Sequence, residues 1–142
     1  MRLSLIFRLC LIGCLLAPSA LLAQASPEPK FTLTLLFDGK PVDESKGVPL
    51  NSRTLTATSA PDSQTGKPEA EVVIEKGFIN LARENPRVAV IAWNGKGSLE
   101  TLASQAQPGD RYVVEIEKAY FRNKNGQVKA FPNHIVYSIP LY

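Results

Sequence analysis

The chain has 142 residues, of which 44% are hydrophobic and 20% are charged. This balance is that of one soluble domain and excludes a collagen-like, low-complexity or multi-pass membrane protein. The net charge is +3, and it falls to +1 if Arg2 and Arg8 belong to a removed leader. The remaining basic residues are scattered among acids, so the sequence predicts no basic face for nucleic acid.

The first 25 residues have the three parts of a secretory signal peptide. A basic start precedes an apolar stretch at 9–17, and the run Ala23-Gln24-Ala25 follows it. A basic start, a short apolar core and an A-x-A exit predict cleavage after Ala25 and export. A retained membrane anchor is the alternative, but the apolar stretch is shorter than the roughly 20 residues of a spanning helix, and Pro18 interrupts it.

Both cysteines, Cys10 and Cys14, lie inside this predicted leader. The run 11–14 resembles a loose lipobox, which would place a lipid on Cys14 and tether the protein to a membrane. The residues after Cys14 stay apolar, where a lipoprotein would turn polar. After cleavage, a mature chain of about 117 residues has no thiol and depends on its core alone for stability.

Alternating apolar residues predict short strands separated by polar connections. Asp38-Gly39 ends the first strand, a long connection covers 40–50, and 77–86 has no clear pattern. The strand at 87–93 is apolar on both sides, so we expect it to be central or covered. The expected strands lie at 31–37, 53–58, 71–75, 87–93, 112–117 and 135–141, with a further hairpin arm beginning at Gln127.

One helix is predicted at about 98–106. Ser98 stands at the N-cap position, and apolar residues follow at the spacing of one helical face, with Pro108-Gly109 as the stop. Asn125-Gly126 predicts a hairpin with a type I′ turn, in which both central residues have positive φ. About seven strands and one short helix predict an all-β fold, an immunoglobulin-like β-sandwich over 26–142.

Residues that could perform catalysis are few. His134 is the single histidine, so a zinc or copper site is not expected, and no metal or other cofactor is predicted. His134 and Ser138 share a strand face about 13 Å apart, which is too far for a nucleophile pair. Glu115 and Glu117 lie about 7 Å apart on one face and are expected to be solvated acids.

Two further features remain as candidate binding sites. Gly95-Lys96-Gly97 precedes the predicted helix but lacks the spacing of a phosphate-binding loop, so a structural turn is expected. Tyr120, Phe121 and Phe131 flank the predicted hairpin. Because Tyr120 and Phe121 are adjacent on a strand, one of them faces away from the core and is a candidate protein contact, unless both cover the end of the sandwich.

The run 98–116 resembles the last domain of GldM, a periplasmic protein of the gliding-motility and type IX secretion machinery. The likeness continues through 125–128 and ends on 135–141, in the order short helix, Pro-Gly turn, strand, Asn-Gly hairpin and closing strand. It covers the last 45 or so residues well and implies an immunoglobulin-like fold, a Bacteroidota-type source and a periplasmic setting. GldM has an N-terminal transmembrane helix and several domains, whereas a single domain is expected here. The resemblance transfers no catalytic residue.

The leading hypothesis is a non-enzymatic, exported domain that binds another envelope or periplasmic protein. Membrane association is expected only if Cys14 is lipidated or the leader is uncleaved. One alternative is a secreted cargo-type β-sandwich, although the closing residues 138–142 carry no charge where such cargo domains are usually basic. The other is an enzyme or small-ligand carrier, which a deep pocket lined by Trp93 or His134 would favour.

Overall fold

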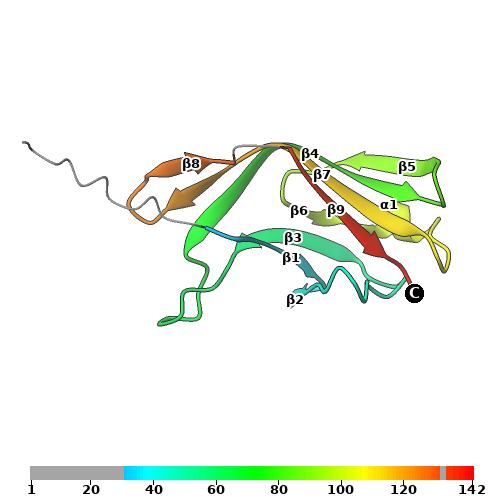
Figure 1. Ribbon diagram of the computed structural model, residues 1–142, viewed down its shortest axis with the longest axis horizontal. Helices are drawn as coiled ribbons and strands as arrows, with labels where there is room; N and C mark the ends of the chain where they lie inside the picture. Colours follow the sequence, from blue (N-terminus) through cyan, green and yellow to red (C-terminus); the bar gives the residue numbers. More distant parts are fainter. Residues whose placement is uncertain (1–30, 132–133) are drawn as a thin grey trace, which may run out of the picture.

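The computed structural model describes residues 31–131 and 134–142; the predicted leader at 1–25 lies outside them. Two antiparallel sheets pack face to face, with β1–β3 below and β4, β7 and β9 above in Figure 1. The fold is therefore an all-β sandwich, as predicted. The four-stranded sheet has the order β2 (Lys40–Pro41), β1 (Leu33–Phe37), β3 (Thr54–Ser59) and β6 (Lys96–Ser98). The five-stranded sheet has the order β5 (Arg87–Ala92), β4 (Ala70–Ala82), β7 (Arg111–Asn123) and β8 (Val128–Ala130), with β9 (Ile135–Pro140) also paired to β7.

The core lies between the two sheets and follows the predicted period of two. Tyr112 and Val114 of β7 are fully buried, and the Tyr112 ring stacks 6.1 Å from that of Phe37 on the opposite sheet. Along β9 the inward residue Ile139 is buried, whereas Val136 is 54% exposed. One apolar face per strand is thus removed from water, which is the main stabilising term for a sandwich of this kind.

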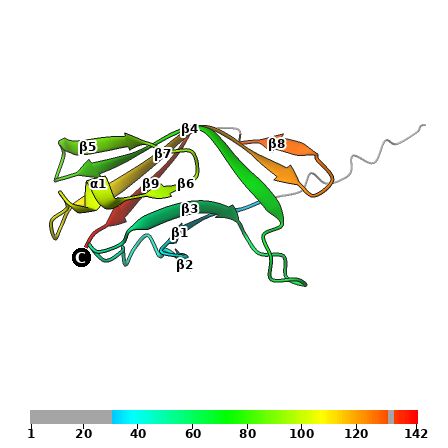
Figure 2. The same ribbon diagram turned by 180° about the vertical axis from the view of Figure 1, so that it is seen from behind.

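The longest element pair is the β4–β7 ribbon, in which each strand has 13 residues. Its register shifts twice between Ile74 and Gly77, because Glu75 of β4 and then Glu117 of β7 have no partner in the ladder and form bulges. A bulge bends a strand and interrupts its alternation, which explains why the sequence pattern of this segment is ambiguous. Beyond the bulges, the far ends of β4 and β7 continue with β8 as an extension beside the sandwich (Figures 1 and 2).

The expectation that the 87–93 strand is central or covered is wrong. This segment forms β5, the terminal strand of the five-stranded sheet, and Val90 on it is 52% exposed. Its inward residues Ala89 and Ile91 pack on the core, while the outward ones face water. An apolar sequence on both faces does not distinguish a covered strand from an apolar edge, because the difference depends on which other segments lie beside it.

The predicted helix is shorter than expected. α1 spans Glu100–Ala103, and Leu99 rather than Ser98 occupies its N-cap position. Ser98 ends β6, but its hydroxyl still accepts a hydrogen bond from the Glu100 N–H at 3.2 Å. Leu99 and Leu102 are fully buried, so this single turn closes one side of the core, and burial rather than helix propensity holds it.

The type I′ turn expected at Asn125-Gly126 occurs instead at Asp38-Gly39, where the sequence predicted only the end of a strand. Asp38-Gly39 joins β1 to β2 with positive φ at both residues, as a two-residue type I′ turn requires. At Asn125-Gly126 the hairpin is confirmed, but only Gly126 has positive φ (80°). The Gly126 N–H bonds to the Asn123 carbonyl at 3.0 Å, so this is a three-residue loop with a glycine bulge rather than a type I′ turn.

Candidate functional site

The three aromatic residues predicted as a contact site lie in different environments. Phe121 is 3% exposed, and its ring packs against Phe31 and Phe131 at centroid distances of 5.0 and 4.4 Å. Tyr120 lies on the other face of β7, where its hydroxyl accepts a hydrogen bond from Arg122 at 3.0 Å. Phe121 and Phe131 therefore form an internal cluster of the extension, and Tyr120 alone points outward. A role of these residues in binding stays a prediction.

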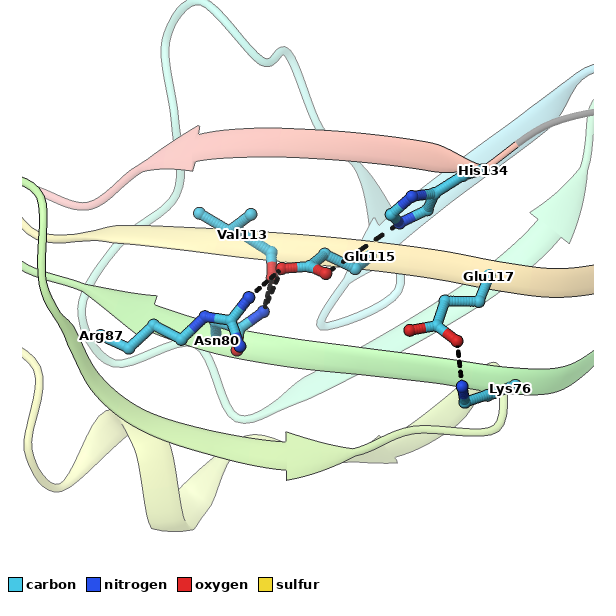
Figure 3. A network of polar contacts seen from close by, with 7 residues as sticks. All are labelled: Lys76, Asn80, Arg87, Val113, Glu115, Glu117 and His134. Atoms are coloured by element: carbon cyan, nitrogen blue, oxygen red, sulfur yellow. Dashed lines mark hydrogen bonds and ion pairs between the residues drawn. The ribbon is translucent and has the colours of Figure 1, made fainter.

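A polar network occupies the outer face of the five-stranded sheet (Figure 3). One carboxylate oxygen of Glu115 accepts hydrogen bonds from Arg87 at 2.9 Å and from the Asn80 amide at 2.8 Å. The other oxygen lies 4.0 Å from Nε2 of His134. β4, β5 and β7 each supply one of the hydrogen-bonded groups, so the network joins three strands on the side away from the core.

The neighbouring acid, Glu117, forms a separate ion pair with Lys76 (Figure 3). Each carboxylate is thus bound to its own cation, and the two do not face a common point as a hydrolytic pair would. The Ser138 hydroxyl accepts a hydrogen bond from Nε of Arg111 at 2.7 Å, while His134 lies beside Glu115. Within 31–131 and 134–142, no cluster of three or more metal-ligating side chains occurs.

Sequence reasoning missed Asn80 as a member of this network. Its side chain is 1% exposed on a face that otherwise meets water, because its neighbours cover it. Its Oδ1 has no hydrogen-bond partner among the described residues. The only signal in the sequence is one polar residue inside the apolar run 78–82, in the segment without a clear pattern.

An open groove lies where the ends of β5 and β6 approach each other. It has a volume of about 430 Å³, and Trp93 lies in its wall with 5% of its surface exposed. The Trp93 indole N–H donates to the Leu55 carbonyl at 3.4 Å, which directs the polar edge of the ring inward. The groove is lined by the bulged part of β4 and by the ends of β5 and β6, and it is open to solvent, unlike the deep pocket that would favour a carrier or an enzyme.

The predicted glycine-flanked lysine lies at this groove. Gly95 turns the chain with a φ of +96°, and Lys96-Gly97 begin the edge strand β6. Gly95 therefore lies in the expected turn, whereas Lys96 and Gly97 belong to a strand that the sequence did not predict. Among the described residues, no helix is long and apolar enough to cross a membrane.

Together, these observations define an all-β sandwich domain with an ion-paired outer face and a terminal strand of exposed valines. The chain belongs to the GldM C-terminal domain family, whose model matches residues 27–142. This match confirms the resemblance seen in the closing strands and extends it over the segments before residue 98. It associates the chain with gliding motility and type IX secretion. No curated protein and no solved structure matches the chain.

Proposed function

We propose that this chain is an exported, non-enzymatic interaction domain that docks on another protein of the bacterial envelope. The observation that carries the proposal is a set of exposed apolar side chains that lie among the ion pairs on the outer face of the five-stranded sheet. Val90 and Val136, on its two edges, are 52% and 54% exposed, with the half-buried Phe78 and Val113 between them. Exposed apolar side chains on the same face as a set of polar groups provide a surface on which another protein can dock.

The polar groups of the same face support binding rather than catalysis. Glu115, Glu117 and Ser138 are each engaged by a cation from another strand of the sheet. These polar groups lie beside the apolar residues, as the polar rim of a protein interface lies beside its apolar centre. The family membership supports a partner that takes part in gliding motility or type IX secretion.

The proposed location is the periplasm. It is supported by the leader-like residues 1–25 and by a family whose members belong to membrane-associated periplasmic machinery. Removal of the leader would leave a soluble domain, whereas a lipid on Cys14 or an uncleaved leader would hold it at the membrane.

The test is chemical crosslinking in the native cells, followed by purification of the tagged protein and identification of the captured proteins. We expect one envelope protein to be enriched in the wild type and lost in Val90→Lys/Val136→Lys, with an unchanged melting temperature. Protection from added protease in intact cells is expected for a periplasmic protein. Digestion would favour the secreted cargo alternative, and absence of any captured protein would contradict the proposed function.

A further inference from the structure

β5 is a free edge of the five-stranded sheet. In the described part of the chain it pairs only with β4. The Trp93 N–H donates to the Gly77 carbonyl at 2.9 Å, and the pairing continues through Ile91↔Ile79 and Ala89↔Leu81. Because hydrogen-bonded and non-bonded pairs alternate along an antiparallel ladder, the N–H and C=O groups of Val90 and Ala92 point away from β4. These groups form a template for one more strand.

The free edge has a defined length. A register shift opposite Leu81-Ala82 places Val88 in a bulge at the start of β5, which disrupts pairing there. From Ala89 to Trp93 the strand is regular, and it leads directly into the groove beside β6. A segment of about five residues could therefore pair with this edge before it reaches the groove.

The groove carries one uncompensated positive charge. Glu75 is paired with Lys118, and Lys76 is paired with Glu117. Lys96, within the described residues, makes no ion pair and is exposed at the groove wall. An acidic side chain at one end of an incoming segment would satisfy this cation.

A second copy of the chain does not supply that acid. The stretch from Arg87 to Lys96 contains these two cations and no acidic residue. If two β5 strands paired antiparallel about Val90, Arg87 of one copy would lie opposite Trp93 of the other, at the end that carries Lys96. In this register Arg87, already paired with Glu115, approaches that end of the strand, so self-pairing brings Lys96 no acidic partner.

We propose that β5 binds an extended acidic segment of a partner protein, which adds an antiparallel strand to the five-stranded sheet and places a carboxylate beside Lys96. This inference rests on the proposed function, since it specifies how the partner docks. Main-chain hydrogen bonds to Val90 and Ala92 would supply affinity, and Lys96 would select an acidic residue near the N-terminus of the segment.

The probe is a fluorescein-labelled peptide, Glu-Val-Thr-Val-Thr-Val, with a counterpart in which lysine replaces the glutamate. We expect the wild type to bind the acidic peptide more tightly, and Lys96→Glu to reverse the preference. Each change should be about threefold to fivefold, the range for a surface ion pair. In amide exchange measured by NMR, Val90 and Ala92 should become about tenfold slower or more when peptide saturates the protein.

Val90→Pro removes the outward N–H and leaves the bonds to β4 in place, as proline is tolerated on an edge. The matched control is Val128→Pro on β8, the strand at the far end of the same sheet. Its N–H also points outward, because the Asn123 N–H donates to the Gln127 carbonyl at 2.9 Å and the ladder alternates from there. We expect Val90→Pro to weaken peptide binding about tenfold or more, since the edge loses a donor and gains a bulky ring, and Val128→Pro to leave it unchanged.

The proposal is overturned if both proline variants weaken peptide binding equally. It is also overturned if the amides of Val90 and Ala92 are not protected by the peptide, or if Lys96→Glu does not change the peptide preference. A wild-type dimer in sedimentation that Val90→Pro dissociates would also overturn it, in favour of self-pairing. If Val90→Pro does not fold, the proposal is tested by amide exchange in the wild type and by the reversed peptide preference of Lys96→Glu. If a folded Val90→Pro still captures the envelope partner by crosslinking, strand addition at β5 is refuted but the proposed function stands. If the wild type binds the peptide but captures no partner, the peptide site on β5 stands and the proposed function is refuted.

Discussion

At the scale of single residues, Asp110 shows how a buried charge is stabilised at the start of β7. Its side chain is 2% exposed, and both carboxylate oxygens accept hydrogen bonds from Arg83 at 2.9 Å. The Gln107 N–H donates to the same carboxylate at 2.8 Å. Arg83, and then this backbone bond, hold the pKa of Asp110 below its ordinary value.

A carboxyl group whose pKa is lowered by folding stabilises the native state above its ordinary pKa, and this contribution is lost as the pH falls below that value. We therefore expect Asp110→Asn to lower the free energy of unfolding by about 2 kcal/mol at neutral pH. The loss is smaller than for a fully buried ion pair, because Arg83 is partly solvated. Urea unfolding at several pH values is the measurement. The gap between wild type and variant should narrow below about pH 4; a gap independent of pH would contradict this role.

Gly126 provides a second test, which separates the two residues of one turn. Only Gly126 has a positive φ, and open space surrounds the position of a Cβ there. Gly126→Val should cost about 1–3 kcal/mol through backbone strain alone. Asn125→Val is the matched control and should change the free energy of unfolding little. A type I′ turn would instead penalise both, so thermal unfolding of the two variants distinguishes the turn types.

At the scale of elements, the extension made by β8 and the far ends of β4 and β7 has a small aromatic core of its own. Phe31, Phe121 and Phe131 form it, on the face opposite Tyr120. The rings lie at separations that favour tilted packing. Because Phe131 also packs against the main core, loss of this cluster should loosen the extension and its junction with the sandwich first.

We expect Phe121→Ala to cost about 3–5 kcal/mol, as for other fully buried phenylalanines, and Tyr120→Ala to change stability by less than about 1 kcal/mol. If the extension contributes to docking, Tyr120→Ala should weaken partner binding at an unchanged melting temperature. Calorimetry and the crosslinking assay measure the two effects. Equal stability losses at both positions, with binding unaffected in the folded fraction, would remove the hairpin from the interface.

At the scale of the whole molecule, processing of the leader decides where the protein acts. The exported protein should have an N-terminus near Gln24 or Ser26, because the A-x-A exit ends at Ala25. Intact-mass spectrometry with thiol labelling is the measurement, and the mature protein should have no reactive thiol since Cys10 and Cys14 leave with the leader. Retained Cys10, or a lipid on Cys14, would contradict a soluble periplasmic domain.

Local patterns in the sequence determined much of this fold. The alternation in 112–116 and 135–141 identified the buried faces of β7 and β9, because period two follows from strand geometry alone. The Asn-Gly pair located a hairpin, since glycine is needed wherever φ is positive. The order of closing elements was also sufficient to identify the family, which the model match over 27–142 confirms.

Only the tertiary structure decided which strands have neighbours. The apolar sequence of β5 is compatible with the centre of a sheet, and its edge position follows from the absence of a strand beyond it in the described fold. The bulge near Ile74, the buried Asn80 and the ion pairs of Glu115 and Glu117 likewise depend on strands far apart in the chain. A sequence pattern specifies which face of a strand is apolar, whereas long-range packing determines what covers that face and which charges meet on it.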